Sequence, residues 1–387
     1  MMGHNKTLQT NNRNLARYGG HYIAKSLAVS LLSVFISVYL LANGFSLAQV
    51  GFFLFLQESI NLLFTFVLSR KIYVISLRIV ITLAVIAQMV LVVMVYKFLS
   101  VQWAFLVIIA AIRGFHDSFY WGSYNITLLR LSGNKTGDFL GKWHSAITVA
   151  TVGTTLIAGY VLDHYSPGWL LFFTLILYIV SIIPLRKLLF AKLPRNEVLP
   201  LRQSFSSPTN RYIFLVSHLN EFGIKLLDSF LPVYIFIVFK NFVSLGVAAM
   251  FAAAGQAVYS YLVGKNSDNP QRRPFLLFGN IVGFAIVFSS LAFMKSPNFI
   301  FLASSLLGFF WLASYITAEA GINKRHIIEY PYGKKMLERF GENIAGMLVG
   351  GVIMLASALS LQTALAVAPL YMVCIALIIY WRYKHLI

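Results

Sequence analysis

Long apolar runs separated by short polar or basic segments fill almost the whole chain. A helix that crosses a membrane needs about 20 mainly apolar residues, and twelve runs approach this length. Backbone polar groups in hydrocarbon must be hydrogen-bonded within their own segment, so these runs are predicted to be helices. The short alternating pattern of a membrane β-barrel is not present. We therefore expect an all-α membrane protein with twelve transmembrane helices. The predicted spans are 22–44, 48–69, 74–96, 102–128, 143–162, 168–190, 212–238, 243–263, 274–294, 298–321, 341–358 and 363–381.

The runs fall into two groups of six. A polar break with three prolines at 191–211 is interpreted as a cytoplasmic linker. It separates an N-terminal six-helix bundle, 22–190, from a C-terminal six-helix bundle, 212–387, which ends in a short cytoplasmic C-terminus. A polar, basic cytoplasmic tail at 1–21 precedes the first bundle. Run starts in the two halves correspond at an offset of about 190–198 residues, which indicates a pseudo-symmetric repeat.

Composition supports a lipid environment and an orientation. The chain is 59% hydrophobic and 11% charged, against roughly 25% charged residues in a soluble domain. Of its 31 Lys and Arg residues, 26 lie in segments on one predicted side and three, Lys97, Lys240 and Lys295, lie on the other. By the positive-inside rule both termini are cytoplasmic, in a multi-pass protein of the plasma (cytoplasmic, inner) membrane. The net charge of +19 is thus assigned to topology, and no nucleic-acid partner is expected.

Several charged residues lie near the centres of predicted spans. A charge at this depth costs ~3 kcal/mol or more and usually faces a polar cavity. Glu221, Lys225 and Asp228 follow one another at i, i+4 and i+7, which places them on one helix face. The six mid-span charges are Glu58, Arg113, Asp117, Glu221, Lys225 and Asp228.

The fourth predicted helix carries a second charged face. Arg113 and Asp117 are spaced i, i+4, and the aromatic residues Tyr120, Trp121 and Tyr124 continue beside them. These rings either line the path of an amphiphilic or aromatic ligand or pack the core. His116 adjoins Asp117 and is a candidate proton relay or a hydrogen-bonded structural residue.

Two interpretations of the mid-span charges stay open. They are self-neutralising pairs that hold helices together, or they form a site for substrate and coupling ion. Four acids against two bases leave an excess of negative charge, and a buried unpaired carboxylate tends to bind a proton. Glu58 has no basic partner on its own helix, so Glu58 and then Asp228 are the candidates for proton coupling.

The segment Gly264–Arg273 resembles a loop motif of the major facilitator superfamily, which has Gly, Asp and a basic pair between helices. The six-plus-six layout and the central loop extend this resemblance over the chain. It implies that Asp268 latches one conformation together with Gly264, Arg272 and Arg273. The fifth predicted helix lacks the proline of the family's antiporter motif, which argues against a drug/proton antiporter.

These patterns predict a secondary active transporter that moves a small solute by alternating access. The excess of acidic residues at mid-span predicts that transport is coupled to protons. The alternatives are a lipid or lysolipid translocator, or a non-transporting receptor or assembly protein that keeps the fold. An enzyme is not expected, because no phosphate-binding loop, metal motif or nucleophile elbow is present. No cofactor or metal is expected. The expected partners are the lipid bilayer, a small-molecule substrate and a proton or other coupling ion, with the protein as a monomer.

Overall fold

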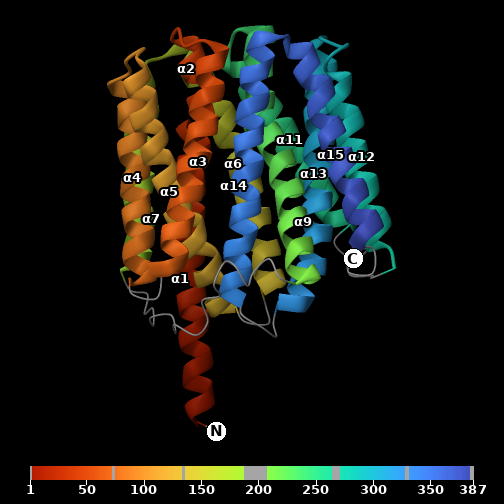
Figure 1. Cartoon of the computed structure of the whole chain (residues 1–387). Coiled ribbons are helices and arrows are strands. Elements are labelled where there is room, and N and C mark those ends of the chain that lie inside the picture. Colours follow the sequence, from red (N-terminus) through yellow and green to blue (C-terminus); the bar gives the residue numbers. More distant parts are fainter. Residues whose placement is uncertain are drawn as a thin grey trace.

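The structure is a computed structural model that describes the backbone of residues 2–71, 75–132, 136–186, 207–263, 271–326 and 331–383. Within these ranges the regular secondary structure is helical, and most of the helices run side by side in one bundle (Figure 1). The first part of the chain forms α1 (Met2–Leu32), η1 (Ser33–Phe35), α2 (Ile36–Ala42), α3 (Leu47–Lys71), α4 (Leu77–Lys97), α5 (Trp103–Ser132), α6 (Thr136–His164) and α7 (Pro167–Leu185). The second part forms α9 (Pro208–Lys225), η4 (Leu226–Phe230), α10 (Leu231–Phe239), α11 (Phe242–Val263), α12 (Arg273–Ser290), α13 (Pro297–His326), α14 (Pro331–Ala358) and α15 (Leu361–Tyr383).

Eight segments of the described chain are long and apolar enough to cross a membrane. Two shorter apolar helices, Phe242–Ala257 and Phe275–Ser290, lie among them. Large apolar side chains such as Trp169 and Phe293 are exposed on the bundle, as expected where lipid rather than water is the solvent. The chain is thus a multi-pass, all-helical membrane protein. The eight segments are Asn14–Ala42, Leu47–Leu68, Leu77–Lys97, Pro167–Leu185, Pro208–Phe239, Pro297–Tyr315, Met336–Ala358 and Leu361–Arg382.

Several helices extend beyond the apolar runs that predicted them. The first begins at Met2 rather than at residue 22, and its N-terminal part projects from the bundle (Figure 1). The eleventh predicted span, 341–358, belongs to α14, which begins at Pro331. Hydropathy marks the length of chain that lipid solvates, whereas backbone hydrogen bonding sets where a helix ends. Polar turns at the membrane boundary are therefore helical in the structure, although hydropathy alone predicts that they are loops.

The start of α9 follows local rules. The Ser207 hydroxyl accepts a hydrogen bond from the Asn210 amide (3.1 Å), and Pro208 occupies the first turn, where its missing N–H is not needed. The helix therefore begins inside the segment 191–211 that was expected to be a linker. Residues 191–206 of that segment lie outside the described chain.

A π-helical turn, η4, joins α9 to α10. Its cause is Pro232, because a proline ring clashes with the carbonyl of the residue four positions earlier, which here is Asp228. The turn widens to relieve that clash. Turns of this kind occur often at functional sites, and this one lies in the middle of the segment Pro208–Phe239.

Two close helix crossings join the first part of the chain to the second: α3 against α14, and α6 against α11. A Cβ added to Gly350 of α14 would lie 2.5 Å from the Phe55 nitrogen of α3. A Cβ added to Gly246 of α11 would lie 2.8 Å from the Thr155 carbonyl oxygen of α6. Both contacts require glycine, because small residues allow two helix backbones to approach closely.

The α6/α11 crossing also carries a charged cap. Both carboxylate oxygens of Asp163, on α6, accept hydrogen bonds from backbone amides at the start of α11, from Phe242 (2.8 Å) and Val243 (2.7 Å). Asn241 caps the next amide, that of Ser244 (2.7 Å). Asp163 thus satisfies N–H groups that the helix itself leaves unpaired, and its charge is favourable at a helix N-terminus.

Candidate functional site

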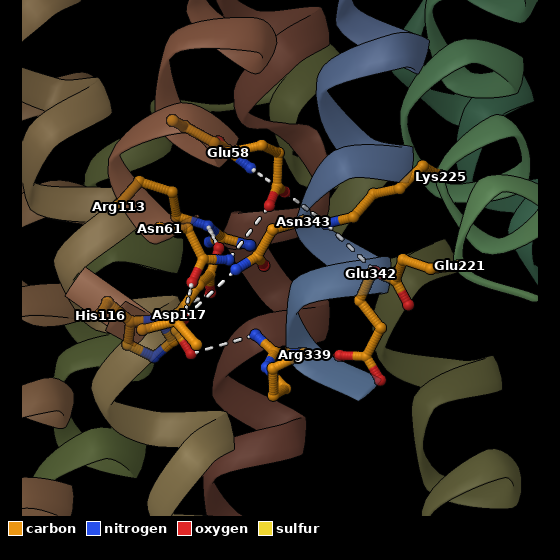
Figure 2. A network of polar contacts seen from close by, with 12 residues as sticks. Glu58, Asn61, Arg113, His116, Asp117, Glu221, Lys225, Arg339, Glu342 and Asn343 are labelled. Carbon is orange, nitrogen blue, oxygen red and sulfur yellow. Dashed lines mark hydrogen bonds and ion pairs between the residues drawn. The ribbon is translucent and has the colours of Figure 1, made fainter. Parts of the chain in front are cut away.

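Glu58 lies at the centre of a buried polar network (Figure 2). Its side chain is on α3 and only 2% of the residue is exposed. One oxygen accepts hydrogen bonds from Gln57 (3.1 Å) and from the Lys225 ammonium (2.7 Å), and the other accepts one from Asn61 (3.0 Å). The expectation that Glu58 lacks a basic partner therefore holds only for its own helix. Tertiary packing supplies the partner from α9.

Lys225 is shared by two carboxylates. Besides Glu58, its ammonium lies 3.5 Å from an oxygen of Glu221, one turn earlier on α9. The expected i, i+4 pair is therefore formed. Figure 2 shows Lys225 between the two acids, one from α3 and one from its own helix. Of these two contacts, the one with Glu58 joins α9 to α3, and the one with Glu221 lies within α9.

Asp228 does not join this network. It lies in the π-helical turn, where the i+7 spacing of a regular α-helix no longer applies. Its side chain is exposed, and within the described residues no hydrogen bond or ion pair reaches it. Of the predicted group, Glu221 and Lys225 are in direct contact, whereas Asp228 makes no hydrogen bond or ion pair with a described residue, so a joint role for all three stays a prediction.

Arg113, His116 and Asp117 form a second cluster on α5. The Arg113 Nε donates to one oxygen of Asp117 (3.1 Å), and His116 Nδ1 lies 2.9 Å from the other. This confirms the i, i+4 pair expected between Arg113 and Asp117. Gly114 brings the cluster close to α3, because a Cβ there would lie 2.6 Å from the Gln57 carbonyl oxygen.

Helix α14 also supplies residues to the polar network, and the sequence analysis did not predict them. Arg339 was counted among the inward loop cations, but it lies within α14 and is 8% exposed. It pairs with Glu342, and its Nη2 lies 3.4 Å from the backbone oxygen of Asp117 (Figure 2). Asn343 donates to Thr65 of α3 (3.2 Å). The i, i+3 spacing of Arg339 and Glu342 is typical of an ion pair on a helix. The predicted span 341–358 begins after Arg339, so this pair was not recognised.

Lys25 is the other residue that the topology argument misplaced. It was counted as a cytoplasmic-side cation, but it lies inside α1 and is 4% exposed. Its ammonium lies over the ring of Tyr120, 3.8 Å from the centroid, and 4.7 Å from that of Trp121. The sequence alone does not show whether a single lysine between apolar turns is buried or extends its ammonium to the membrane surface.

The three aromatic residues predicted on α5 are brought together. Tyr120 is fully buried, stacks on His116 with centroids 5.5 Å apart, and its hydroxyl lies 3.2 Å from His21 Nε2. Tyr124 stacks on Tyr18 (5.5 Å). These contacts show that Tyr120 and Tyr124 pack the interior of the bundle, while Trp121 stays partly exposed beside Lys25.

The predicted conformational latch is only partly described. Gly264 and Asp268 lie outside the described residues. Arg272 immediately precedes α12 and is exposed, and Arg273 begins that helix, but its side chain is not described. Among the residues that the structure does describe, no group of three or more His, Cys, Asp or Glu could hold a metal ion.

The arrangement brings ionisable and polar groups from four helices together. Groups from α3, α5, α9 and α14 meet around Glu58 and Asp117, within hydrogen-bond distance of one another (Figure 2). Ion pairs buried in this way are costly to break unless a proton or another ion replaces the lost partner. Such a network is therefore suited to respond to protons and to charged solutes.

Comparison with known proteins gives one match. A sequence model of the family described as Major Facilitator Superfamily matches residues 22–325. The comparison with curated proteins gives no match. The matched region includes α3, α5 and α9, and so most of the network described above.

Proposed function

Because the chain belongs to the major facilitator superfamily, a superfamily of transporter type, we propose that it is a proton-coupled secondary transporter of a small solute. It works by alternating access in the cytoplasmic membrane, with both termini inside. Its twelve transmembrane helices form two six-helix bundles, one before and one after the central linker. The substrate site lies between the bundles, as in other duplicated transporters.

The observation that carries this proposal is the ion pair between Glu58 of α3 and Lys225 of α9. It joins the two proposed bundles at mid-span. With Glu221 as a second acid, one ammonium faces two carboxylates, so the three groups have a formal charge of −1 when all are ionised. Uptake of one proton neutralises them. A buried group of this kind is expected to bind a proton when its surroundings change.

The geometry indicates how proton binding would act on the bundles. A proton on Glu58 removes the charge attraction to Lys225 and leaves Lys225 paired with Glu221 on the same helix. The link from α3 to α9 is then weakened, and the bundles can rock apart. Deprotonation restores the pair. Asp228, exposed in the π turn of the same span, is the second candidate for the coupling proton.

The test uses the full chain in proteoliposomes with a pH-sensitive dye inside. Imposed pH gradients should drive uptake of a solute found by screening, and solute addition should in turn move protons. Glu58→Gln, which keeps the hydrogen-bonding shape but cannot be ionised, should reduce gradient-driven uptake at least tenfold. Solute exchange without a gradient should persist, because exchange needs no net proton movement.

Asp228→Asn is the parallel variant, and Lys295→Gln, in an exposed position between α12 and α13, is the control. If uptake keeps the wild-type dependence on pH in both Glu58→Gln and Asp228→Asn, proton coupling through these carboxylates is wrong. If no solute or lipid moves in any preparation, the proposal of a transporter is wrong and a non-transporting receptor is favoured.

A further inference from the structure

The first turn of α11 is fixed against α6 at one end of the bundle. The Asp163 carboxylate of α6 accepts hydrogen bonds from the amides of Phe242 (2.8 Å) and Val243 (2.7 Å). A Cβ added to Gly159, one turn before Asp163, would lie 2.4 Å from the Phe242 carbonyl oxygen. Both the amide and the carbonyl group of Phe242 therefore contact α6, and α11 separates from α6 here only when these contacts break.

The link to Asp163 is additional to the local cap of α11. Asn241 directly precedes the helix and accepts the Ser244 amide (2.7 Å), as an N-cap residue does. Asp163 comes from a helix in the first part of the chain, so its two hydrogen bonds join the two parts. A carboxylate that accepts backbone N–H groups forms charge-assisted hydrogen bonds, which are stronger than those between neutral groups.

The Phe242 side chain packs between the two parts of the chain. Its ring centroid lies 6.3 Å from that of Phe35 in η1, 6.4 Å from that of Tyr39 in α2 and 5.3 Å from that of Phe236 in α10. Phe242 is 9% exposed and Phe35 is fully buried. Aromatic rings at these distances attract one another, and their packing excludes water. The four rings therefore join η1 and α2 to α10 and α11 through one apolar contact.

This ring cluster lies to one side of the polar network. Helix α2, which carries Tyr39, is at the end of the bundle opposite the projecting start of α1, and in the proposed orientation that end faces outward (Figure 1). Phe236 follows Lys225 by eleven residues in the span Pro208–Phe239, which is about 16 Å along the axis at 1.5 Å per residue. The rings thus lie outward of Lys225, where a transporter that opens to each side in turn needs a barrier.

We propose that Phe242 is the outer gate of the transport path and that Asp163 positions it in the closed state. This inference rests on the proposed transport function. When the outer side opens, the first turn of α11 leaves α6, and the Phe242 ring leaves Phe35 and Tyr39. Asp163 is exposed, so water replaces the two amides as its partner, and closing restores the original hydrogen bonds.

The test follows the reactivity of Thr155→Cys in a Cys374→Ser background of the full chain. Thr155 is 6% exposed and lies where α6 crosses α11. An impermeant maleimide added outside intact cells should label this cysteine slowly. Asp163→Ala should raise the labelling rate about fivefold, the factor expected when a helix N-terminus loses its acceptor, and Phe242→Ala should raise it too. Asp163→Asn should fall between Asp163→Ala and wild type, because one side-chain acceptor remains.

Three controls accompany the reporter. Lys240→Gln changes the charge of an exposed residue two positions before Phe242, and it should leave the labelling of Thr155→Cys unchanged. Ser304→Cys, at a fully buried position within α13, reports general unfolding and should stay unlabelled in the Asp163 variants. Lys97→Cys, on the side expected to face outward, should react in every variant.

Several results would overturn the proposal. One is labelling of Thr155→Cys that neither Asp163→Ala nor Phe242→Ala changes. A rise that Lys240→Gln reproduces would assign the effect to local charge, and a rise shared by Ser304→Cys would assign it to lost stability. A Lys97→Cys variant that does not react from outside would place this end of the bundle in the cytoplasm, and the gate would not be an outer one.

The gate and the transport function fail separately, because the labelling needs no solute. If Asp163→Ala exposes Thr155→Cys and no solute moves across proteoliposomes, the transport function is wrong and the opening between α6 and α11 stands. If a solute is transported and the labelling does not respond to Asp163→Ala or Phe242→Ala, the transport function stands and the gate is wrong.

Discussion

At the scale of single residues, the contact between Glu58 and Lys225 shows why a buried charge must be judged together with its partners. Each residue alone is a costly ion at mid-span, and together they form a pair at 2.7 Å. Removing one member leaves the other uncompensated, whereas removing both leaves only Glu221 without its cation. Single and double variants can therefore separate the interaction energy of the pair from the free-energy cost of burying each charge.

We predict that Lys225→Met destabilises the protein by about 3–5 kcal/mol, because Glu58 and Glu221 lose their shared cation. The double variant Glu58→Gln with Lys225→Met should recover part of that loss, because Glu58 is then neutral while Glu221 still lacks Lys225. Chemical unfolding of the detergent-solubilised protein measures both, in a double-mutant cycle with Glu58→Gln. Equal instability of the double variant and Lys225→Met would show that the two residues are not coupled.

At the scale of helices, the crossing of α3 and α14 depends on one glycine and not on its neighbour. A Cβ on Gly350 would meet the backbone of Phe55, while a Cβ on Gly351 would meet no atom within 4 Å. We predict that Gly350→Ala costs about 1–3 kcal/mol by overpacking. Gly351→Ala should be neutral or more stable by up to about 1 kcal/mol, because alanine favours helix. Thermal unfolding compares the two directly, and equal melting temperatures would contradict the close crossing.

The α6/α11 crossing gives a prediction for the helix cap. Asp163→Ala should cost about 1 kcal/mol, because two amides at the start of α11 lose their acceptor. Asp163→Asn should cost less, since one side-chain acceptor remains. Hydrogen exchange of a peptide covering the first turn of α11 is the measurement, and it should be faster in the alanine variant. Unchanged exchange there would show that Asp163 does not hold the helix end, and Asp228→Asn serves as the control.

At the scale of the whole molecule, the distribution of Lys and Arg predicts one orientation in the membrane. Tags on both termini should be accessible from the cytoplasmic side only. In a Cys374→Ser background, cysteines replacing Lys97, Lys240 or Lys295 should react with an impermeant maleimide added outside intact cells. Termini on opposite sides of the membrane would contradict the proposed twelve spans and the positive-inside assignment.

The sequence by itself determined that this is a multi-pass helical membrane protein. The reason is that hydrophobicity, and the need for each segment to form its own backbone hydrogen bonds in lipid, are properties of each segment. It also identified the local pairs, Arg113 with Asp117 and Glu221 with Lys225, because i, i+4 contacts depend only on helix geometry. It did not identify the contacts that join helices. Lys225 reaches Glu58, Arg339 reaches Asp117 and Lys25 packs on Tyr120 only because distant segments are folded together. Which charge meets which was decided by tertiary packing, since burial and partner choice are properties of the assembled bundle.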